Sequence, residues 1–220
     1  MISRNIEFEY CLAHTSPQPS LLELLDRETN LKTLSPQMQS GAYQGMLLRF
    51  ISLMIQPKRV LEVGTFSGYA TLCLAEGLAA EGVLHTIEVN DEMGWIIRKY
   101  IHLAGLDDKI VLHLGDAVEI IPTIQEVFDL AFLDAGKLDY KRHYEMVLPK
   151  IRPGGFLLAD NVLWDGKVAS LDPKDETARV LREFNDFVHN DPRVENILLP
   201  LRDGLMLMRK VDSIRTVDGG

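Results

Sequence analysis

The 220-residue sequence has little of several features that mark specialised protein classes. It has two cysteines, Cys11 and Cys73, which excludes a disulfide scaffold and predicts two reduced thiols in a cytoplasmic protein. No apolar run approaches the ~20 residues of a membrane span, and the first ten residues lack the apolar stretch of a signal peptide. Internal repeats and low-complexity tracts are absent as well. We therefore expect a globular protein that has no membrane partner.

Basic charge is also scarce in the sequence. Lys and Arg number 23 against 32 Asp and Glu, which gives a formal net charge of −9. An acidic surface repels polyanions, and no run of Lys or Arg resembles a nucleic-acid-binding stripe, so nucleic acid is not an expected partner. The chain is long enough to bury a sizeable core and to fold without a metal. A metal site in this chain would therefore indicate a function.

Short apolar runs alternate with longer amphipathic stretches through the middle of the chain. The apolar runs are typical of strands that are covered on both faces. They are Arg59–Gly64, Val83–Val89, Ile110–Leu114, Asp129–Asp134 and Gly155–Asp160. The stretches with helical spacing are Tyr69–Ala80, Asp91–Ala104, Ala117–Val127 and Leu138–Lys150. This alternation predicts an α/β fold in which helices cover both faces of a mostly parallel sheet.

The two ends of the chain differ from this middle part. Two helices are expected near Ser20–Thr29 and Ser35–Ile55, the second with Ser35 as its cap and Pro36 at its first position. A further helix is expected at 175–190. The last two strands, Val194–Pro200 and Gly204–Lys210, are separated by a connection of hairpin length, so we expect an antiparallel pair and seven strands in all.

These elements predict a single domain over residues 1–220. Its expected parts are an N-terminal helical region at 1–57, a core at 58–210 and a flexible tail at 211–220. The polar residues and the two final glycines of that tail are typical of a frayed end.

The first candidate site is the loop that follows the first strand, Glu62 to Tyr69. Gly64 and Gly68 let a ligand approach the backbone there, and the next helix offers its free N–H groups. The G-x-x-x-G spacing matches neither the dinucleotide-binding nor the phosphate-loop pattern. The pair of glycines therefore indicates a ligand site or only a tight turn.

Two further candidates follow the second and third strands. Glu88 lies 24 residues after Gly64, near the distance at which an acid binds ribose hydroxyls, although an ordinary strand-end acid is the alternative. Gly115, Asp116 and Ala117 follow the third strand. Asp116 is expected to cap the next helix, to contact an adenine edge, or to do both.

The sharpest candidate follows the fourth and fifth strands. Asp134 ends one strand, and Asp160 and Asn161 end the other. Parallel strands bring these ends to one crevice, where three oxygen ligands suit Mg²⁺, Mn²⁺ or Ca²⁺. Two helix-capping acids without a metal are the alternative. Lys137, close to Asp134, is a candidate base.

These motifs, taken together and in this order, resemble the cation-dependent small-molecule O-methyltransferases of the caffeoyl-CoA and catechol type, which use S-adenosylmethionine. The similarity runs from about Leu34 to Lys210 and implies a Rossmann-like fold. It implies metal ligation by Asp134, Asp160 and Asn161, and catalysis by Lys137 and Asp134. The cofactor contacts that it implies are Met38, Glu62, Gly64, Thr65, Phe66, Ser67, Gly68, Tyr69, Glu88, Gly115, Asp116, Ala117 and Asp134.

The resemblance also implies a function and partners. The expected activity is methyl transfer from S-adenosylmethionine to a small phenolic, catechol-like acceptor, with a divalent cation, Mg²⁺ first and Mn²⁺ or Ca²⁺ as alternatives. A homodimer is expected, with region 1–57 as lid and dimer contact. A metal-independent small-molecule methyltransferase and a catalytically silent cofactor-binding protein are the alternative interpretations.

The sequence departs from the family pattern at four positions. Ala70 stands where a serine often holds the methionine carboxylate, and Gly136 replaces an aspartate of the caffeoyl-CoA branch. Met46 replaces a glutamine of the cofactor lid, and Met206 stands at the expected place of a catechol-branch glutamate. These changes concern the acceptor more than the cofactor.

Overall fold

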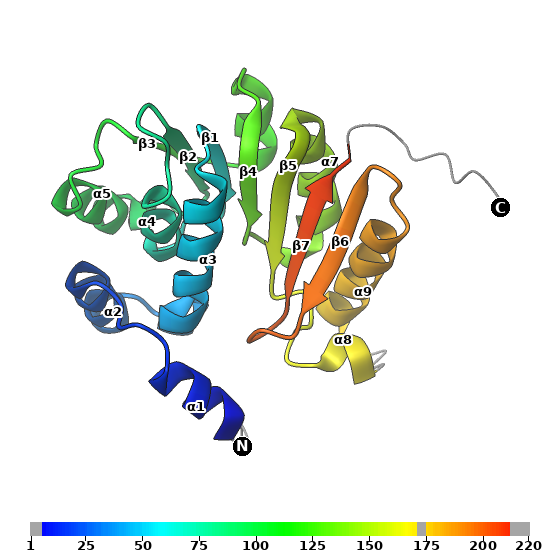
Figure 1. Cartoon of the computed structure of the whole chain (residues 1–220), viewed down its shortest axis with the longest axis horizontal. Coiled ribbons are helices and arrows are strands. Elements are labelled where there is room, and N and C mark those ends of the chain that lie inside the picture. Colours follow the sequence, from blue (N-terminus) through cyan, green and yellow to red (C-terminus); the bar gives the residue numbers. More distant parts are fainter. Residues whose placement is uncertain (1–5, 171–174, 212–220) are drawn as a thin grey trace.

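The computed structural model of the chain describes residues 6–170 and 175–211. A seven-stranded sheet with the order β3-β2-β1-β4-β5-β7-β6 forms its centre (Figure 1). The first five strands are parallel, and β7 is antiparallel to both β5 and β6, which confirms the predicted sheet. The strands are β1 Arg59–Val63, β2 Val83–Glu88, β3 Ile110–Leu114, β4 Phe128–Leu133, β5 Ile151–Asp160, β6 Val194–Leu199 and β7 Leu205–Lys210.

The strand register explains why the candidate residues meet. Val63 at the end of β1 pairs with Ile87 of β2 and with Leu133 of β4. Leu133 in turn pairs with Ala159 of β5. The carboxyl ends of four parallel strands are therefore level, and the residues that follow them emerge at one edge of the sheet.

The helices cover both faces of the sheet, as expected. Figure 1 shows α2, α3, α4 and α5 on one side and α7 and α9 beside the other half of the sheet. The helices are α1 Ile6–Ala13, α2 Ser20–Lys32, α3 Gly41–Ile55, α4 Tyr69–Ala75, α5 Gly94–Leu103, α6 Ala117–Ile120, α7 Tyr140–Val147, α8 Lys167–Ser170 and α9 Glu176–His189. In the described ranges, no helix combines the length and the apolar character that a bilayer crossing needs.

The N-terminal region differs from the prediction in two ways. The helix expected from Ser35 begins at Gly41, because Pro36–Met38 forms a separate 3₁₀ turn and Gln39 is extended. Ser35 makes no capping hydrogen bond. The second difference is α1, a helix that was not predicted and none of whose side chains is buried.

Four predicted helices are shorter than expected; one of them, α5, begins at Gly94 because Asp91–Met93 forms a separate 3₁₀ turn. The helix from Ala117 ends at Ile120 because Pro122 cannot continue it, and Pro149 follows the end of α7 in the same way. The helix from Tyr69 ends at Ala75, just before Gly77, where a Cβ atom would overlap the backbone of Ser52 in α3. The close approach of α3 and α4 thus needs a residue without a side chain at this point.

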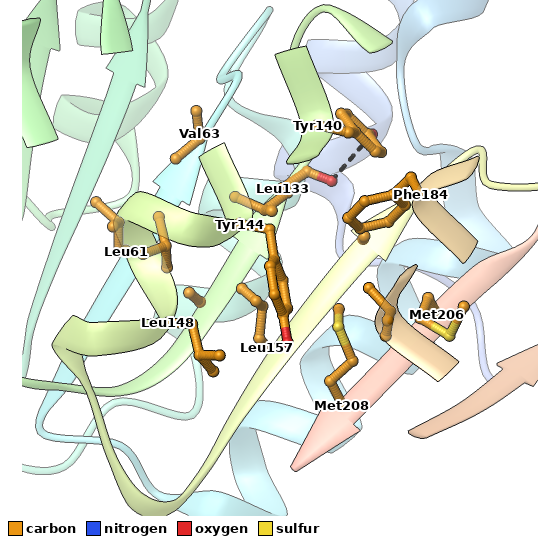
Figure 2. Close-up of a cluster of buried hydrophobic side chains, with 14 of the residues drawn as sticks. Leu61, Val63, Leu133, Tyr140, Tyr144, Leu148, Leu157, Phe184, Met206 and Met208 are labelled. Atoms are coloured by element: carbon orange, nitrogen blue, oxygen red, sulfur yellow. Dashed lines mark hydrogen bonds between the residues drawn. The ribbon is translucent and has the colours of Figure 1, made fainter. Parts of the chain in front are cut away.

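Two hydrophobic clusters fill the space between the sheet and its helices. Figure 2 shows the cluster under α7 and α9, where the Phe184 ring meets Tyr140 and Tyr144 edge-on at centroid distances of 5.4 and 6.0 Å. Met206 belongs to this cluster and is 1% exposed. The side chain at this departure from the family pattern therefore fills the core. Except for Val211, the tail predicted at 211–220 lies outside the described residues.

Candidate active site

A cavity of about 610 Å³ opens at the edge of the sheet where the parallel strands end. Its lining includes the residues predicted after β1, β2, β3, β4 and β5. Those predicted site residues are Met38, Gly64, Phe66, Glu88, Gly115, Asp116, Ala117, Asp134, Lys137, Asp160 and Asn161. Trp164 also lines the cavity. The predicted residues Glu62, Thr65, Ser67, Gly68 and Tyr69 lie outside this lining.

The loop after β1 is held by the carboxylate of Glu88. One oxygen of Glu88 accepts the backbone N–H groups of Thr65, at 3.2 Å, and Phe66, at 2.7 Å. The other oxygen accepts the N–H of Asn90 at 2.9 Å. A carboxylate has about four lone-pair sites, so these bonds leave capacity for further donors. Glu88 therefore shapes the loop, and its binding of ribose stays a prediction.

Gly64 is required by the packing of β1 against β4. Its φ angle is +96°, and a Cβ atom at this position would overlap the backbone carbonyl of Asp134. Any other residue would push the two strand ends apart. The glycine thus brings the loop and Asp134 to the same wall of the cavity.

Glu62 is fully buried behind the loop and does not line the cavity. One of its oxygens accepts the hydroxyls of Thr71 and Thr86, the second at 2.6 Å, and the other has no partner in the described structure. Burial raises the pKa of Glu62 from 4.5 to about 8. Glu62 therefore joins β1, β2 and α4, and a direct contact with the cofactor stays a prediction.

Neighbouring residues tie this loop to the N-terminal region. The Ser67 hydroxyl donates to the side-chain oxygen of Gln39 at 3.2 Å, and the Gln39 amide donates to Asp26 at 3.2 Å. Ala70 is buried in the core between the sheet and α3. The hydroxyls of its neighbours Tyr69 and Thr71 donate to Gln18 and Glu62.

The position of Asp116 is compatible with both roles that the sequence left open. Its carboxylate accepts the N–H of Val118 at 2.8 Å and so caps α6. It also lines the cavity with Gly115 and Ala117. The cap is confirmed, while the contact with an adenine edge stays a prediction.

Asp134 and Asp160 are linked through Lys137 and Tyr140. The Lys137 ammonium donates to Asp134 and to the Tyr140 hydroxyl, both at 2.7 Å. The Tyr140 hydroxyl donates to the backbone oxygen of Asp160, also at 2.7 Å. Burial, opposed by Lys137 and assisted by the charge of Asp160, raises the pKa of Asp134 to about 7. The same Tyr140 packs on Phe184, so the core fixes this network.

The donor set fits a hard cation better than a metal that prefers thiolate ligands. Asp134, Asp160 and Asn161 supply two carboxylates and one amide oxygen, and the two carboxylates repel each other at close range. In the described part of the chain, no three His, Cys, Asp or Glu side chains are grouped to hold a metal. A cation here therefore depends on the amide of Asn161, whose φ angle is +57°.

Sequence reasoning missed a chain of hydrogen bonds that runs from Arg202 to Asp160. The buried Gln44 amide donates to one oxygen of Asp160 at 2.6 Å, and the N–H of Asn161 donates to the other at 2.7 Å. Arg202 donates to the side-chain oxygen of Gln44 at 3.4 Å and to the backbone oxygens of Ser40 and Gln39. Gln44 lies 116 positions from Asp160 and 158 from Arg202, and no sequence pattern indicates that they meet.

Comparison with known proteins identifies the family. A family model described as O-methyltransferase matches residues 13–211. The chain belongs to the O-methyltransferase family. It is 36% identical to mouse catechol O-methyltransferase domain-containing protein 1, over 76% of this chain and 66% of that protein. It is 32% identical to caffeoyl-CoA O-methyltransferase 1 of Eucalyptus globulus, over 79% of this chain and 75% of that protein.

Solved structures agree with this assignment. The O-methyltransferase of Bacillus cereus in complex with SAH has a TM-score of 0.85 and 27% identity, covering 92% of this chain and 96% of that one. SAH-bound PaMTH1 of Podospora anserina has a TM-score of 0.87 and 27% identity, covering 96% and 99%. The predicted fold and family are confirmed, and the chain is an S-adenosylmethionine-dependent O-methyltransferase.

Replacing Gln44 by leucine tests the Arg202–Asp160 chain in this O-methyltransferase. The variant leaves one buried oxygen of Asp160 without its donor, so we expect a loss of about 1.5–3 kcal/mol in the free energy of unfolding. Urea unfolding in the presence of EDTA measures this loss. Gln37→Leu, in the same segment and outside this chain of hydrogen bonds, is the matched control, and equal losses in both variants would contradict the interpretation.

Glu62→Gln tests the buried carboxyl group. Because the folded state binds a proton at Glu62 up to about pH 8 and the unfolded chain releases it near 4.5, the free energy of unfolding falls as the pH rises through this window. The glutamine side chain cannot bind or release this proton, so the free energy of unfolding of the variant falls less steeply with pH. The slope that remains comes from other groups such as Asp134. Urea unfolding at several pH values from about 5 to about 8 measures both slopes. Identical slopes would refute the raised pKa.

Proposed function

We propose that this O-methyltransferase uses a divalent cation and transfers the methyl group of S-adenosylmethionine to a small catechol-like acceptor. The observation that carries the proposal is the single cavity at the strand ends. Gly64 and Phe66 of the loop after β1 line this cavity together with Glu88. The oxygen donors Asp134 and Asp160 line it as well. A sulfonium methyl group and an acceptor hydroxyl held in one cavity have the proximity that the transfer needs.

The cation is supported by the charges in the cavity. Burial raises the pKa of Asp134 to about 7, and the charge of Asp160 adds to this rise while Lys137 opposes it, so a cation bound at this site would favour the charged carboxylate. The proposed ligands are Asp134, Asp160 and Asn161, with Mg²⁺ as first choice and Mn²⁺ or Ca²⁺ as alternatives. When bound, the cation acts as a Lewis acid that lowers the pKa of an acceptor hydroxyl.

Lys137 is the proposed catalytic residue of the chain. Its ammonium is fixed by Asp134 and Tyr140, and its side chain lies beside the proposed cation ligands. In this position the ammonium would stabilise the acceptor oxyanion, or the neutral amine of Lys137 would take the hydroxyl proton. The loop after β1, held by Glu88, would orient the cofactor for methyl transfer.

The acceptor class follows from the pair of oxygens that a cation of this kind binds. A vicinal diol on an aromatic ring supplies two adjacent oxygens, and Trp164 provides a flat apolar wall in the same cavity. Relatives named catechol O-methyltransferase and caffeoyl-CoA O-methyltransferase support a phenolic acceptor. The alternative is methyl transfer without a metal, and the experiment below distinguishes it from the metal-dependent reaction.

The first test joins binding with turnover. Isothermal titration with S-adenosylmethionine is followed by methyl transfer to caffeic acid or catechol, with Mg²⁺ and with excess EDTA. We expect binding, and turnover that EDTA abolishes. Asp160→Asn is expected to lower turnover at least ~100-fold, because it removes a charged ligand. Asp139→Asn, an exposed acid of the same cavity, is the matched control.

Two outcomes of this test contradict the proposal in different ways. Turnover that persists in EDTA and in Asp160→Asn would favour the metal-independent methyltransferase. Cofactor binding without turnover on any diol would favour the silent cofactor-binding protein.

A homodimer in the cytoplasm is the proposed assembly of the enzyme. Helix α1 has eight residues, none of them buried, and its Ile6 is 84% exposed. Isolated helices shorter than ~12–15 residues are marginal in water, so α1 needs a covering surface. The region 1–57 of a second copy is the occupant that the family resemblance implies. The two cysteines, which form no disulfide, suit a reducing compartment.

Sedimentation velocity tests the assembly. We expect twice the chain mass for the wild type and a shift to monomer for Ile6→Glu, which places a charge in the covered surface. Glu9→Gln on the same helix is the control. A monomeric wild type would refute the dimer.

A further inference from the structure

His143 is a buried, cavity-lining residue that the proposed mechanism does not use. It lies on α7, is 5% exposed, and lines the cavity together with Asp116 and Ala117. Its position is one helical turn beyond Tyr140, which belongs to the network of Asp134 and Asp160. His143 therefore faces the same cavity as the proposed reaction centre.

One ring nitrogen of His143 is unpaired among the residues that the structure describes. Its Nδ1 atom is buried and has no hydrogen bond in the described part of the chain. A buried N–H without an acceptor costs about 1–3 kcal/mol, so the neutral ring of His143 is expected to keep its lone pair at Nδ1 and its proton at Nε2.

The protonation state of His143 follows from its surroundings. Burial lowers its pKa, against the opposing charges of Asp139 and Asp116 and with the assistance of Arg142. A neutral imidazole has one N–H and one lone pair. Because Nδ1 is buried, the Nε2 edge of the ring is the one left to line the cavity, where a ligand can accept its N–H.

The space beside His143 suits a flat, uncharged ring. The cavity is open at Gly136, where a Cβ atom would meet nothing nearer than the Asp139 carboxylate at 4.0 Å. Asp116 and Asp139 line the same cavity, and their charges act on His143 and disfavour a phosphate there. The adenine of the proposed cofactor offers three ring nitrogens as acceptors, and its amino group is a donor that Asp116 can accept.

We propose that His143 binds the purine ring of S-adenosylmethionine by donating its Nε2–H to one of the ring nitrogens. This inference rests on the proposed function, because it assumes that the cofactor occupies this cavity. It assigns a cofactor contact that neither the G-x-x-x-G loop nor the strand-end acids supply. It also gives a reason for a histidine at a buried position where a leucine would pack without a penalty.

Titration calorimetry with S-adenosylhomocysteine tests the contact. His143→Phe keeps the flat ring and removes both nitrogens, and we expect it to bind about five to ten times more weakly. His143→Gln places an amide nitrogen near the position of Nε2 and restores most of the affinity. His143→Asn places its amide nitrogen near Nδ1 and is the matched control that does not restore it. Equal affinity in the wild type and His143→Phe would overturn the inference.

A series of cofactor analogues supplies the test that needs no variant. The 1-deaza, 3-deaza and 7-deaza forms of S-adenosylhomocysteine each replace one ring nitrogen by C–H. We expect one of them to bind the wild type about five to ten times more weakly than the parent, and to show no such difference in His143→Phe. Three analogues that bind the wild type as tightly as the parent would overturn the inference.

The failure of the inference and that of the proposed function are distinguishable. If the wild type binds S-adenosylhomocysteine and the variants and analogues change nothing, the contact of His143 alone is refuted. If the wild type does not bind S-adenosylhomocysteine, the cofactor site of the proposed function is refuted as well.

Discussion

The close approach of β1 and β4 is the constraint on which the rest of the site depends. Gly64 lies against the carbonyl of Asp134, and the register pairs Val63 with Leu133. Parallel strands end at one edge of the sheet. This contact therefore sets the distance between Asp134, beside Lys137, and the loop after β1, whose N–H groups bind Glu88. The two halves of a group-transfer site are therefore held by backbone packing, which is more rigid than any contact between side chains.

The second element of the site is the set of contacts that hold Asp160. Its carboxylate receives the amide of Gln44 and the backbone N–H of Asn161, while Tyr140 holds its carbonyl. Gln44 is on α3 and is joined to Arg202 of the hairpin turn, so the N-terminal region and the C-terminal hairpin meet at this residue. The N-terminal region, whose role as a lid stays a prediction, is therefore fixed through a proposed cation ligand.

Much of the fold could be predicted because its signals are local. Continuous apolar runs identified the strands, and strand ends in a parallel sheet predicted that Asp134 and Asp160 would meet. The start of α3 was predicted wrongly, because a serine followed by proline also begins a 3₁₀ turn. Gln44, Arg202 and His143 were beyond prediction, since their roles arise from contacts between segments far apart in sequence. Local patterns report which residues end a strand, but not which distant side chains complete their hydrogen bonds.

The distribution of charge within the cavity explains how one space can hold two different ligands. At the ends of β4 and β5 the carboxylates of Asp134 and Asp160 concentrate negative charge, which favours a cation and an acceptor that loses a proton. Near α6 and α7, burial keeps His143 neutral beside Asp116, which favours an uncharged base that both donates and accepts hydrogen bonds. A purine can form hydrogen bonds with His143 and Asp116, and because it is uncharged, Asp134 and Asp160 do not repel it. The proposed ligands would thus be separated by electrostatics, and the carboxylates of Asp134 and Asp160 would attract the positive sulfonium of the cofactor toward the proposed acceptor.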